Sequence, residues 1–381
     1  MLYHRISSVR PLSFVCSTFV CWQGKWMGTE ATDRDMALRT LVAKRSNPSS
    51  VLKNVAIVGG THGNELAGVH LIQHFETEPE LVSRPTFSTT CLYSNLDAIK
   101  ANSRYVTSDL NRCFDKEFLD IAKATRKIER HSEMTRAIEL DATLGPKFSK
   151  DPFADMIFDL HNTTSNCGIL LCLHKNDEFA KQVAAHLKTL YPSLCTSFWP
   201  QDDAPFLPTI GRSGMTVEIG PVSHSTVRAK IYEKTKRLLL HALDYIELHN
   251  QYIQNPTDPS IEKVTIKLPV AERRAQIDYP RDELNRLVAF VHPDLQGVRE
   301  LSSLHPIING APVFHTLSGE TLYLDVTKLE PIRKEYPLSA DETYYPMFIN
   351  EAAYYEKGVA FYLTQITERE VSFLKRVDSK L

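Results

Sequence analysis

The first clear pattern of apolar residues is a short run followed by a helical repeat. Residues 54–58 are mostly apolar and end at a Gly59-Gly60 pair. A short apolar run closed by glycine is typical of a buried strand that ends in a tight turn. Apolar side chains then return with the spacing of one helix face, at Leu66, Val69, Ile72 and Phe75. The pattern therefore predicts a strand, a turn and a helix.

The same strand signature recurs further along the chain. Largely apolar runs cover residues 156–160, 169–173 and 215–219, and helical stretches cover residues 179–190 and 227–249. Strands that alternate with helices predict an α/β domain with a mainly parallel or mixed sheet flanked by helices. We assign this domain to residues 51–252.

The pattern of apolar residues changes after a proline-rich linker at residues 255–259. The following apolar pieces are short and are separated by Gly and Pro; they cover residues 264–268, 287–291, 312–314 and 322–324. Short strands with frequent turn residues are typical of β-rich folds. We therefore expect a smaller β-rich C-terminal domain over residues 260–368.

Residues 1–50 show no clear period, and their first 28 residues contain Arg and Lys but no Asp or Glu. This composition fits either a targeting segment or an extension without a fixed conformation. The lack of a convincing small-residue cleavage site favours the extension.

Composition narrows the function classes. Lys and Arg number 44 and Asp and Glu 46, so the formal charge is −2, which argues against a protein that coats nucleic acid. The longest apolar run, residues 11–22, is shorter than the ~20 residues of a membrane span. The seven cysteines form no C-x-x-C pair, so no disulfide framework is indicated and a reducing, cytoplasmic setting is favoured. We expect no nucleic-acid partner and no stable membrane insertion.

Candidate metal ligands lie where the predicted strands end. His62 and Glu65 follow the first strand, and His161 closes the strand that contains residues 156–160. Two histidines and a carboxylate form a common ligand set of catalytic zinc, although H-x-x-E alone often arises by chance. Asp159 precedes His161 by two residues, so both side chains point to the same side of a strand, where Asp159 could fix the tautomer of the ring.

A carboxylate inside an apolar strand is a candidate acid and base. Glu218 lies within the run of residues 215–219, where burial without a task would be costly. A proton donor such as a metal-bound water would give it that task. The alternative is a strand-end Glu that pairs with a surface cation.

Arginines near residue 110 offer a substrate anchor. Arg112 beside Asn111 could grip a small carboxylate, and Arg104 could face a developing oxyanion. Loop arginines are, however, more often solvated or ion-paired.

His70 and His74 have a zinc-like spacing but lie opposite the predicted apolar stripe, so we expect both on the surface. Cys113 is the best placed of the weak nucleophile candidates.

Several motifs are absent from the sequence: G-x-S-x-G, the phosphate-binding G-x-x-x-x-G-K-[ST] and G-x-G-x-x-G. Their absence disfavours serine hydrolases, NTPases and dinucleotide-binding enzymes.

Five segments, in order along the chain, resemble the aspartoacylase and aminoacylase-3 enzymes, which are relatives of zinc carboxypeptidases that remove acyl groups from N-acyl amino acids. These segments are Gly59-Gly60-Thr61-His62-Gly63-Asn64-Glu65, Asp109-Leu110-Asn111-Arg112, Phe158-Asp159-Leu160-His161-Asn162-Thr163-Thr164, Val217-Glu218-Ile219-Gly220-Pro221 and Asn350-Glu351-Ala352-Ala353-Tyr354-Tyr355-Glu356-Lys357. The resemblance runs from about Lys53 to Thr364.

The resemblance implies a role for each matching position. His62, Glu65 and His161 would hold one Zn²⁺ per subunit, and Glu218 would be the general base and acid. Arg104 would polarise the scissile carbonyl. Asn111 and Arg112 would anchor the α-carboxylate of the substrate. The C-terminal domain would be a cap that narrows access to the zinc, and Tyr354 would contact the substrate from this capping domain. The resemblance also implies a homo-oligomer.

One departure bears on the substrate. Members specific for acetylaspartate carry an arginine ten residues before the catalytic Glu, where this chain has Pro208. Either Arg212 reaches in by a shifted loop, or the pocket takes neutral or aromatic side chains, as in aminoacylase-3. Nearby aromatic residues, Phe198, Trp199 and Phe206, favour the second.

We therefore expect a zinc-dependent deacylase of small N-acyl-L-amino acids that releases the amino acid and a carboxylate such as acetate. Aspartoacylase activity is the alternative. More distant alternatives are a metallocarboxypeptidase and an inactive, zinc-stabilised binding protein.

Overall fold

The computed structural model describes residues 50–199, 203–302 and 305–377. The prediction about the N-terminal extension concerns residues that lie outside this described part, except for Ser50.

Within the described residues, nine strands form one mixed sheet in the order β11-β12-β7-β5-β4-β6-β3-β1-β2. Four neighbouring strands, β2, β1, β3 and β6, run parallel, β4 runs antiparallel to β6, and β12 runs antiparallel to both β7 and β11. This mixed sheet confirms the predicted fold class. The strands are β1 Asn54–Gly59, β2 Ser88–Tyr93, β3 Met156–Asn162, β4 Ile169–His174, β5 Cys195–Trp199, β6 Ser213–Ile219, β7 Ile261–Asp278, β11 Tyr345–Met347 and β12 Val359–Arg376.

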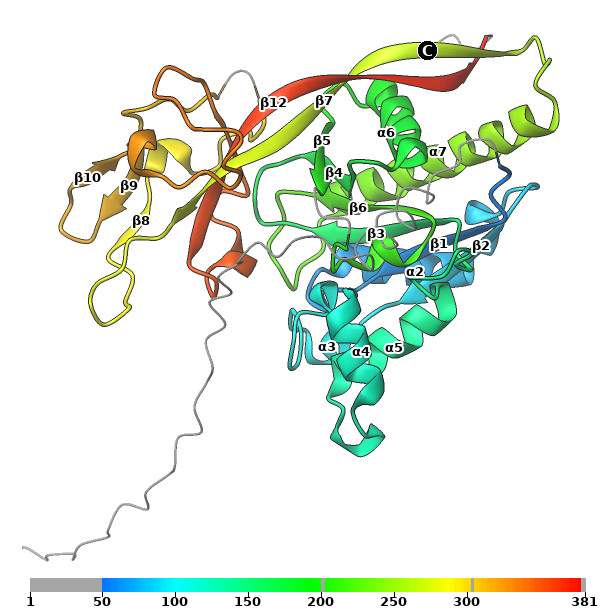
Figure 1. The fold of residues 1–381 in the computed structure, drawn as a ribbon, viewed down its shortest axis with the longest axis horizontal. Coiled ribbons are helices and arrows are strands. Elements are labelled where there is room, and N and C mark those ends of the chain that lie inside the picture. Colours follow the sequence, from blue (N-terminus) through cyan, green and yellow to red (C-terminus); the bar gives the residue numbers. More distant parts are fainter. Residues whose placement is uncertain (1–49, 200–202, 303–304, 378–381) are drawn as a thin grey trace, which may run out of the picture.

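Helices cover both faces of this sheet (Figure 1). Side chains of α2, α6 and α7 share one apolar core with the sheet, and residues of α4 and α5 belong to a second core that also contains Ile157 of β3. The described helices are α2 Leu66–Thr77, α3 Leu96–Ala101, α4 Lys116–Ala124, α5 Ser132–Leu144, α6 Glu178–Leu190 and α7 Ala229–Gln254.

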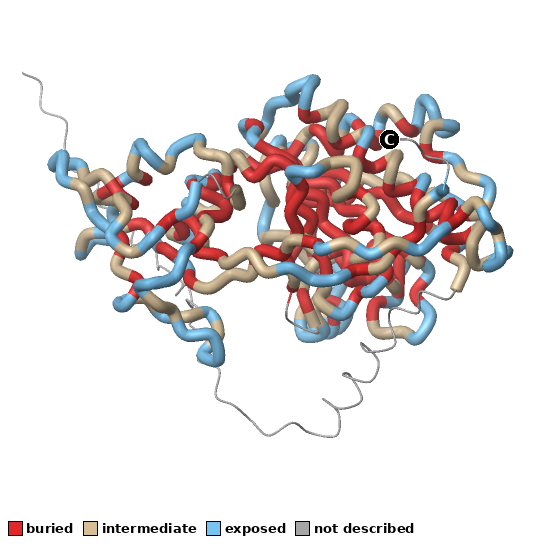
Figure 2. Tube along the Cα trace, turned by 90° about the horizontal axis from the view of Figure 1, so that it is seen from above, coloured by how far each residue is buried: buried red, intermediate tan, exposed pale blue. Residues whose placement is uncertain are grey.

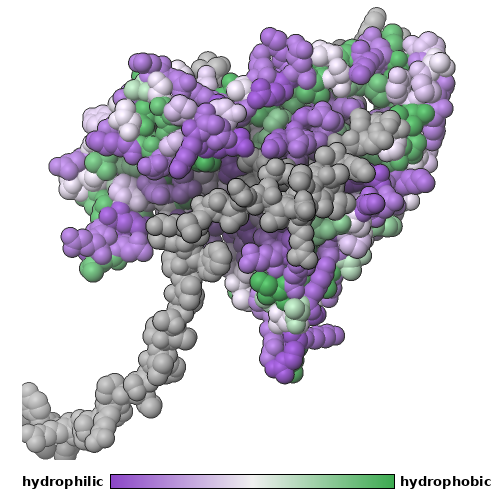
Figure 3. Space-filling view, viewed as in Figure 1, coloured by the Kyte–Doolittle hydropathy of each residue, from purple (hydrophilic) through white to green (hydrophobic). Residues whose placement is uncertain are grey.

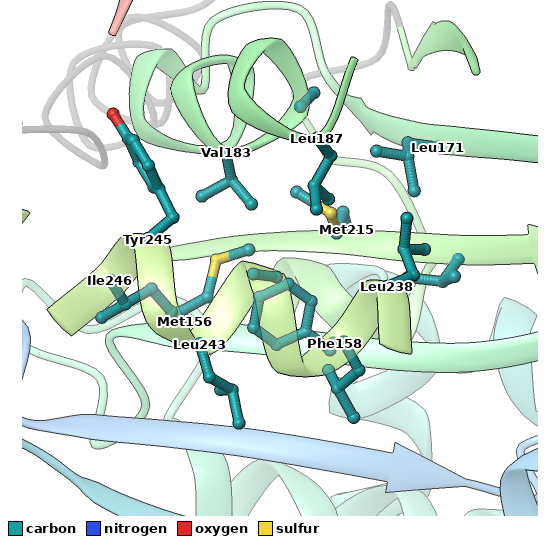
Figure 4. Packing of buried hydrophobic residues seen from close by; sticks show 14 of the residues in the cluster. Met156, Phe158, Leu171, Val183, Leu187, Met215, Leu238, Leu243, Tyr245 and Ile246 are labelled. Atoms are coloured by element: carbon teal, nitrogen blue, oxygen red, sulfur yellow. The ribbon is translucent and has the colours of Figure 1, made fainter. Parts of the chain in front are cut away.

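Successive side chains of β3 point to opposite faces of the sheet, so the strand contributes to two apolar cores. Met156 and Phe158 pack in the core of α6 and α7, as Figure 4 shows, whereas Ile157 points to the opposite face. Asp159 and His161 continue the face of Ile157 because side chains alternate along a strand. Every residue of β3 is buried, and Figure 2 shows the buried chain concentrated at the centre of the larger domain. The polar residues at the end of β3 are thus held by a rigid, close-packed strand.

A smaller domain is built on a three-stranded antiparallel sheet of β8 Ala289–Val291, β9 Pro312–Thr316 and β10 Thr321–Tyr323. It has its own core, which includes Phe314 and Phe361. This domain confirms the predicted β-rich C-terminal part. Strands β7 and β12 pair over most of their length and join the two domains as one long ribbon (Figure 1). Both strands therefore belong to the large sheet and to the smaller domain.

On the face shown in Figure 3, hydrophilic residues alternate with smaller hydrophobic patches. In the part of the chain that the structure describes, no helix combines the length and the apolar character needed to cross a membrane.

Candidate functional site

The loop between β1 and α2 presents two polar side chains at the carboxyl end of the sheet. His62 and Glu65 are both buried in this loop, and the backbone N–H of Glu65 donates to the carbonyl of His62 at 3.1 Å. Gly63 lies between them, packed so closely that a Cβ atom would be 2.0 Å from the carbonyl carbon of Ala98. Glycine thus lets the loop lie flat against the start of α3 and fixes where His62 and Glu65 point.

Two side chains from the loop after β1 and one from β3 converge on one point. Nδ1 of His62 is 2.7 Å from Oε1 of Glu65, and Nδ1 of His161 is 2.9 Å from Oε2 of the same carboxylate. The two Nδ1 atoms are 3.1 Å apart. The three side chains form the one group of this kind among the described residues whose ligand atoms all lie within 4.8 Å of one another. The structure thus brings together the three predicted metal ligands.

Two further carboxylates fix how the histidine rings are protonated. Nε2 of His161 is 2.7 Å from Oδ2 of Asp159, and Nε2 of His62 is 3.0 Å from Oδ1 of Asp109. An ionised carboxylate only accepts hydrogen bonds, so each Nε2 donates. In a neutral imidazole the Nδ1 atom then carries a lone pair.

When both rings are neutral, two lone pairs of ring nitrogens and one carboxylate therefore face the same point. Lone pairs repel one another unless a proton or a cation lies between them. Tetrahedral zinc with Zn–N bonds of about 2.0–2.1 Å would place two nitrogen ligands roughly 3.4 Å apart, close to the observed separation. The donor set and its spacing therefore fit a zinc ion.

The electrostatics of this cluster also favour a cation. Burial raises the pKa of Glu65, but His62 and His161 outweigh it and hold the pKa well below its usual range. Burial lowers the pKa of His161, but Asp159 and Glu65 outweigh it and hold that pKa well above its usual range. Three carboxylates, those of Glu65, Asp109 and Asp159, contact the two histidine rings. This arrangement stabilises a positive charge between the rings.

Glu218 lies beside this cluster on the neighbouring strand. It is the register partner of His161 in the parallel pair of β3 and β6. Burial, followed by repulsion from Glu65 and Glu351, raises the pKa of Glu218 to about 8, although His161 and Arg104 oppose the shift. Its carboxylate makes no hydrogen bond or ion pair to the described residues, so it is available to exchange a proton with a ligand.

The predicted arginines lie next to the cluster. Arg104 donates from Nη2 to Oδ2 of Asp109 at 3.0 Å, and its Nη1 is 3.4 Å from Oε1 of Glu65. Its Nε is buried without a partner among the described residues. The guanidinium carbon of Arg112 lies 5.0 Å from the ring centroid of Phe206, and Oδ1 of Asn111 accepts from the backbone N–H of Leu207 at 2.9 Å.

A cavity of about 710 Å³, its open mouth included, joins these groups. Tyr354 lines it from the C-terminal domain and packs edge to face against Phe348 and Tyr362. Its lining residues are His62, Glu65, Arg104, Asn111, Arg112, Asn162, Thr163, Cys172, Ser197, Trp199, Phe206, Thr216, Glu218, Arg273, Met347, Phe348, Glu351, Ala353 and Tyr354. A cavity of this size, with apolar walls and a few charged groups, is typical of a site for a small ligand.

Arg212 is the one predicted site residue that the structure does not bring to this cavity. Its guanidinium is 2.8 Å from Asp151 and 3.3 Å from Asp155. It lines a second, smaller pocket together with residues of the 3₁₀ turn at Leu207–Ile210. Arg212 therefore does not line the cavity that holds the other predicted site residues.

The remaining candidates are mostly as expected. His70 is exposed, but His74 is half-buried and bonded to the hydroxyl of Tyr232, so only His70 fits the predicted surface position. Burial raises the pKa of Cys113 to about 12, which disfavours it as a nucleophile.

Sequence reasoning missed three residues. Asp109, although part of a conspicuous segment, was given no role, yet it orients His62. Glu351 joins the C-terminal domain to the loop after β3, because its Oε2 accepts from the backbone N–H of Thr164 at 2.8 Å. Arg273 lines the cavity from β7. Each depends on a contact between distant parts of the chain that spacing cannot reveal.

Comparison with known proteins agrees with this geometry. Residues 51–246 match the succinylglutamate desuccinylase/aspartoacylase catalytic domain, and residues 272–366 match the AstE/AspA barrel-sandwich hybrid domain. The chain is 38% identical to a human N-acyl-aromatic-L-amino acid amidohydrolase (carboxylate-forming) over 323 residues, 84% of this chain and 92% of the relative. It is 36% identical to aspartoacylase of Rattus norvegicus over 315 residues, 81% of this chain and 91% of the relative.

Among solved structures, murine aminoacylase 3 superimposes with a TM-score of 0.73 at 31% identity, covering 86% of this chain and 99% of that one. The chain thus belongs to the succinylglutamate desuccinylase/aspartoacylase family.

Proposed function

We propose that this protein is a zinc-dependent deacylase that hydrolyses N-acyl-L-amino acids to a free amino acid and a carboxylate such as acetate. One observation carries the proposal: Nδ1 of His62, Nδ1 of His161 and the Glu65 carboxylate converge beside Glu218, whose own carboxylate makes no hydrogen bond or ion pair with the residues that the structure describes. The names of the relatives, an amidohydrolase and an aspartoacylase, support the reaction class.

His62, Glu65 and His161 would hold one zinc ion per chain. Zinc with three protein ligands and an open position supplies a Lewis acid that polarises a carbonyl and makes water more acidic. Glu218 would take a proton from the attacking water and return it to the leaving nitrogen. Its raised pKa, about 8, suits a group that both accepts and donates a proton near neutral pH.

The arginines would orient the substrate. Nε of Arg104 is buried without a partner among the described residues, so it can donate to the oxygen that gains charge during the attack. Arg112 and Asn111 would hold the α-carboxylate, since both line the cavity and Arg112 presents a planar fork. Asp159 and Asp109 would keep the two histidines in the tautomer that leaves Nδ1 free.

The C-terminal domain would restrict the substrate to small molecules. Met347, Phe348 and Tyr354 bring apolar and aromatic side chains from this domain to the cavity. Together with Trp199 and Phe206 they favour a neutral or aromatic amino acid, as the human relative's name indicates for that enzyme. Activity on N-acetyl-L-aspartate is the second candidate, supported by the similarity to rat aspartoacylase.

A direct assay tests the proposal. The purified protein should release the free amino acid from N-acetyl-L-tyrosine, and a chelator should abolish the release until zinc is restored. Removal of the last residue from a longer peptide would instead indicate a metallocarboxypeptidase. Stoichiometric zinc binding without hydrolysis of any acyl amino acid would indicate a binding protein. A homo-oligomeric assembly and a cytoplasmic location stay predictions from the sequence.

A further inference from the structure

The floor of the cavity is a row of small polar side chains that leads away from the metal cluster. Thr216, Cys172 and Ser197 are register partners across β6, β4 and β5. Glu218 lies two residues after Thr216 on β6, at the end of the row nearest to His161. Strand β7 follows β5 in the sheet and brings Arg273 to the opposite end. The cavity thus has the metal cluster at one end and an arginine at the other.

Arg273 has no acidic partner among the described residues, in contrast to Arg104 and to the adjacent Arg274. Arg104 lies against Glu65 and Asp109, and the adjacent Arg274 donates from Nε to Gln365 at 2.7 Å and lies 3.4 Å from Glu272. Arg273 makes no ion pair or side-chain hydrogen bond with any described residue.

Aromatic packing, rather than a carboxylate, holds the side chain of Arg273 in place. Its guanidinium carbon lies 5.2 Å from the ring centroid of Tyr362, and that ring meets the ring of Tyr354 at 5.9 Å. Tyr354 is itself a wall of the cavity. A guanidinium held on a ring by one face keeps its N–H groups free for a ligand.

The other charged groups of the cavity leave the charge of Arg273 uncompensated. Glu65 belongs to the metal cluster, and Glu351 is bonded to the loop after β3. Glu218 lies at the other end of the row, beside His161, and no ion pair joins it to Arg273 in the described part of the chain. The positive charge of Arg273 counteracts the effect of burial, which raises the pKa of Tyr354 and of Cys172, so its field reaches into the cavity. A half-buried cation without a counter-ion gains most from a ligand carboxylate, which it can bind through two parallel hydrogen bonds.

We infer that Arg273 binds a second carboxylate of the substrate, separate from the α-carboxylate assigned to Arg112 and Asn111. The enzyme would then also hydrolyse dianionic N-acyl amino acids. The second carboxylate could belong to an acidic amino acid side chain or to the end of a dicarboxylic acyl group. This inference rests on the proposed deacylase function and extends its substrate class.

Four variants and three substrates test it. The substrates are N-acetyl-L-tyrosine, which has one carboxylate, and N-acetyl-L-aspartate and N-succinyl-L-tyrosine, which have two. Arg273→Met removes the charge but keeps much of the apolar stem, Arg273→Lys keeps the charge, and Arg274→Met is the matched control on the opposite face of β7. Should Arg273→Met fail to fold, Arg273→Gln, assayed on the same substrates, replaces it.

The expected result is selective. Arg273→Met should lower kcat/KM about 10- to 100-fold for at least one dianionic substrate, mainly by raising KM, and less than about threefold for N-acetyl-L-tyrosine. Arg273→Lys should restore part of the loss, and Arg274→Met should change none of the three values. A loss confined to N-acetyl-L-aspartate assigns the carboxylate to the side chain, and a loss confined to N-succinyl-L-tyrosine assigns it to the acyl group.

Two outcomes would overturn the inference alone: equal effects of Arg273→Met on all three substrates, or wild-type protein that hydrolyses N-acetyl-L-tyrosine but neither dianionic substrate. If the zinc-loaded wild type hydrolyses none of the three, the proposed function itself fails.

Discussion

Asp159 and His161 lie on the same face of β3, and Oδ2 of Asp159 is 2.7 Å from Nε2 of His161. This contact turns the other ring nitrogen toward Glu65, at 2.9 Å. Oδ1 of Asp159 accepts from the hydroxyl of Thr61 at 2.6 Å, so the carboxylate is itself fixed. One buried carboxylate thus determines which nitrogen of His161 is offered to a cation.

The Asp159→Asn variant should bind zinc about 10- to 100-fold more weakly than the wild type, because an amide orients and polarises the ring less well. Competition with a chromogenic chelator measures the affinity. Asp151→Asn is the control, since Asp151 is exposed and, among the described residues, pairs only with Arg212. Wild-type zinc affinity in Asp159→Asn would show that this contact has no part in holding the cation.

Glu218→Gln should keep one zinc per chain but lose turnover on N-acetyl-L-tyrosine by a factor of about 10²–10⁴, since an amide cannot move the proton. Metal analysis and steady-state kinetics measure the two properties separately. His62→Ala should lose both. Turnover close to wild type in Glu218→Gln would remove Glu218 from the mechanism.

Gly63→Ala should shift the loop that carries His62 and Glu65, because its Cβ would meet the backbone of Ala98. We expect the free energy of unfolding to fall by about 1–3 kcal/mol and zinc affinity to fall with it. Chemical denaturation and zinc titration measure these effects. Gly310→Asn is the control: no atom lies within 4 Å of a Cβ there, and Asn tolerates its positive φ. Unchanged zinc affinity in Gly63→Ala would contradict the importance of this close approach.

Glu300 should make stability depend on pH. Its carboxylate is buried and accepts from the backbone N–H groups of Phe348 and Ile349, and burial raises its pKa from 4.5 to about 8. Between these two values the folded protein binds more protons at this site than the unfolded chain, so the contribution of Glu300 to the free energy of unfolding falls as pH rises.

The Glu300→Gln variant should be less stable than the wild type at pH 5, because the amide can accept only one of the two bonds with its oxygen. From pH 5 to 8, however, it should lose less stability than the wild type. Denaturant unfolding of both metal-free proteins across this range gives the two slopes. Parallel curves would mean that Glu300 does not carry the raised pKa.

Local periodicity predicted β1, β3, β4 and β6 and parts of β7 to β10, but it missed β2, β5, β11 and β12. It predicted the buried face of α2 only in part. The expected stripe was Leu66, Val69, Ile72 and Phe75, whereas the buried residues are Ala67, Gly68, Leu71, Ile72 and Phe75. A Cβ on Gly68 would lie 3.0 Å from Leu160, so the helix turns its smallest residues toward β3 for close contact. A pattern of apolar residues does not detect such a contact, and this is why His74 is half-buried.

The site divides in the same way. The metal cluster could be predicted because His62 and Glu65 follow the end of β1 and His161 lies near the end of β3. The role of Asp159 could be predicted from the period of a strand. The positions of the charged side chains around the metal cluster could not be predicted. Asp109 reaches His62 through a loop, and Arg273 reaches the cavity along a strand shared with the C-terminal domain. Arg212 is close to Glu218 in sequence, yet Asp151 and Asp155 hold it elsewhere.

The most direct test is a titration of metal-free protein with zinc while the hydrolysis of N-acetyl-L-tyrosine is followed. Activity should rise in proportion to added zinc and level off at one zinc per chain, and His161→Ala should show neither zinc binding at this stoichiometry nor activity. Hydrolysis that persists in the metal-free protein, or that continues unchanged in His161→Ala, would contradict the account.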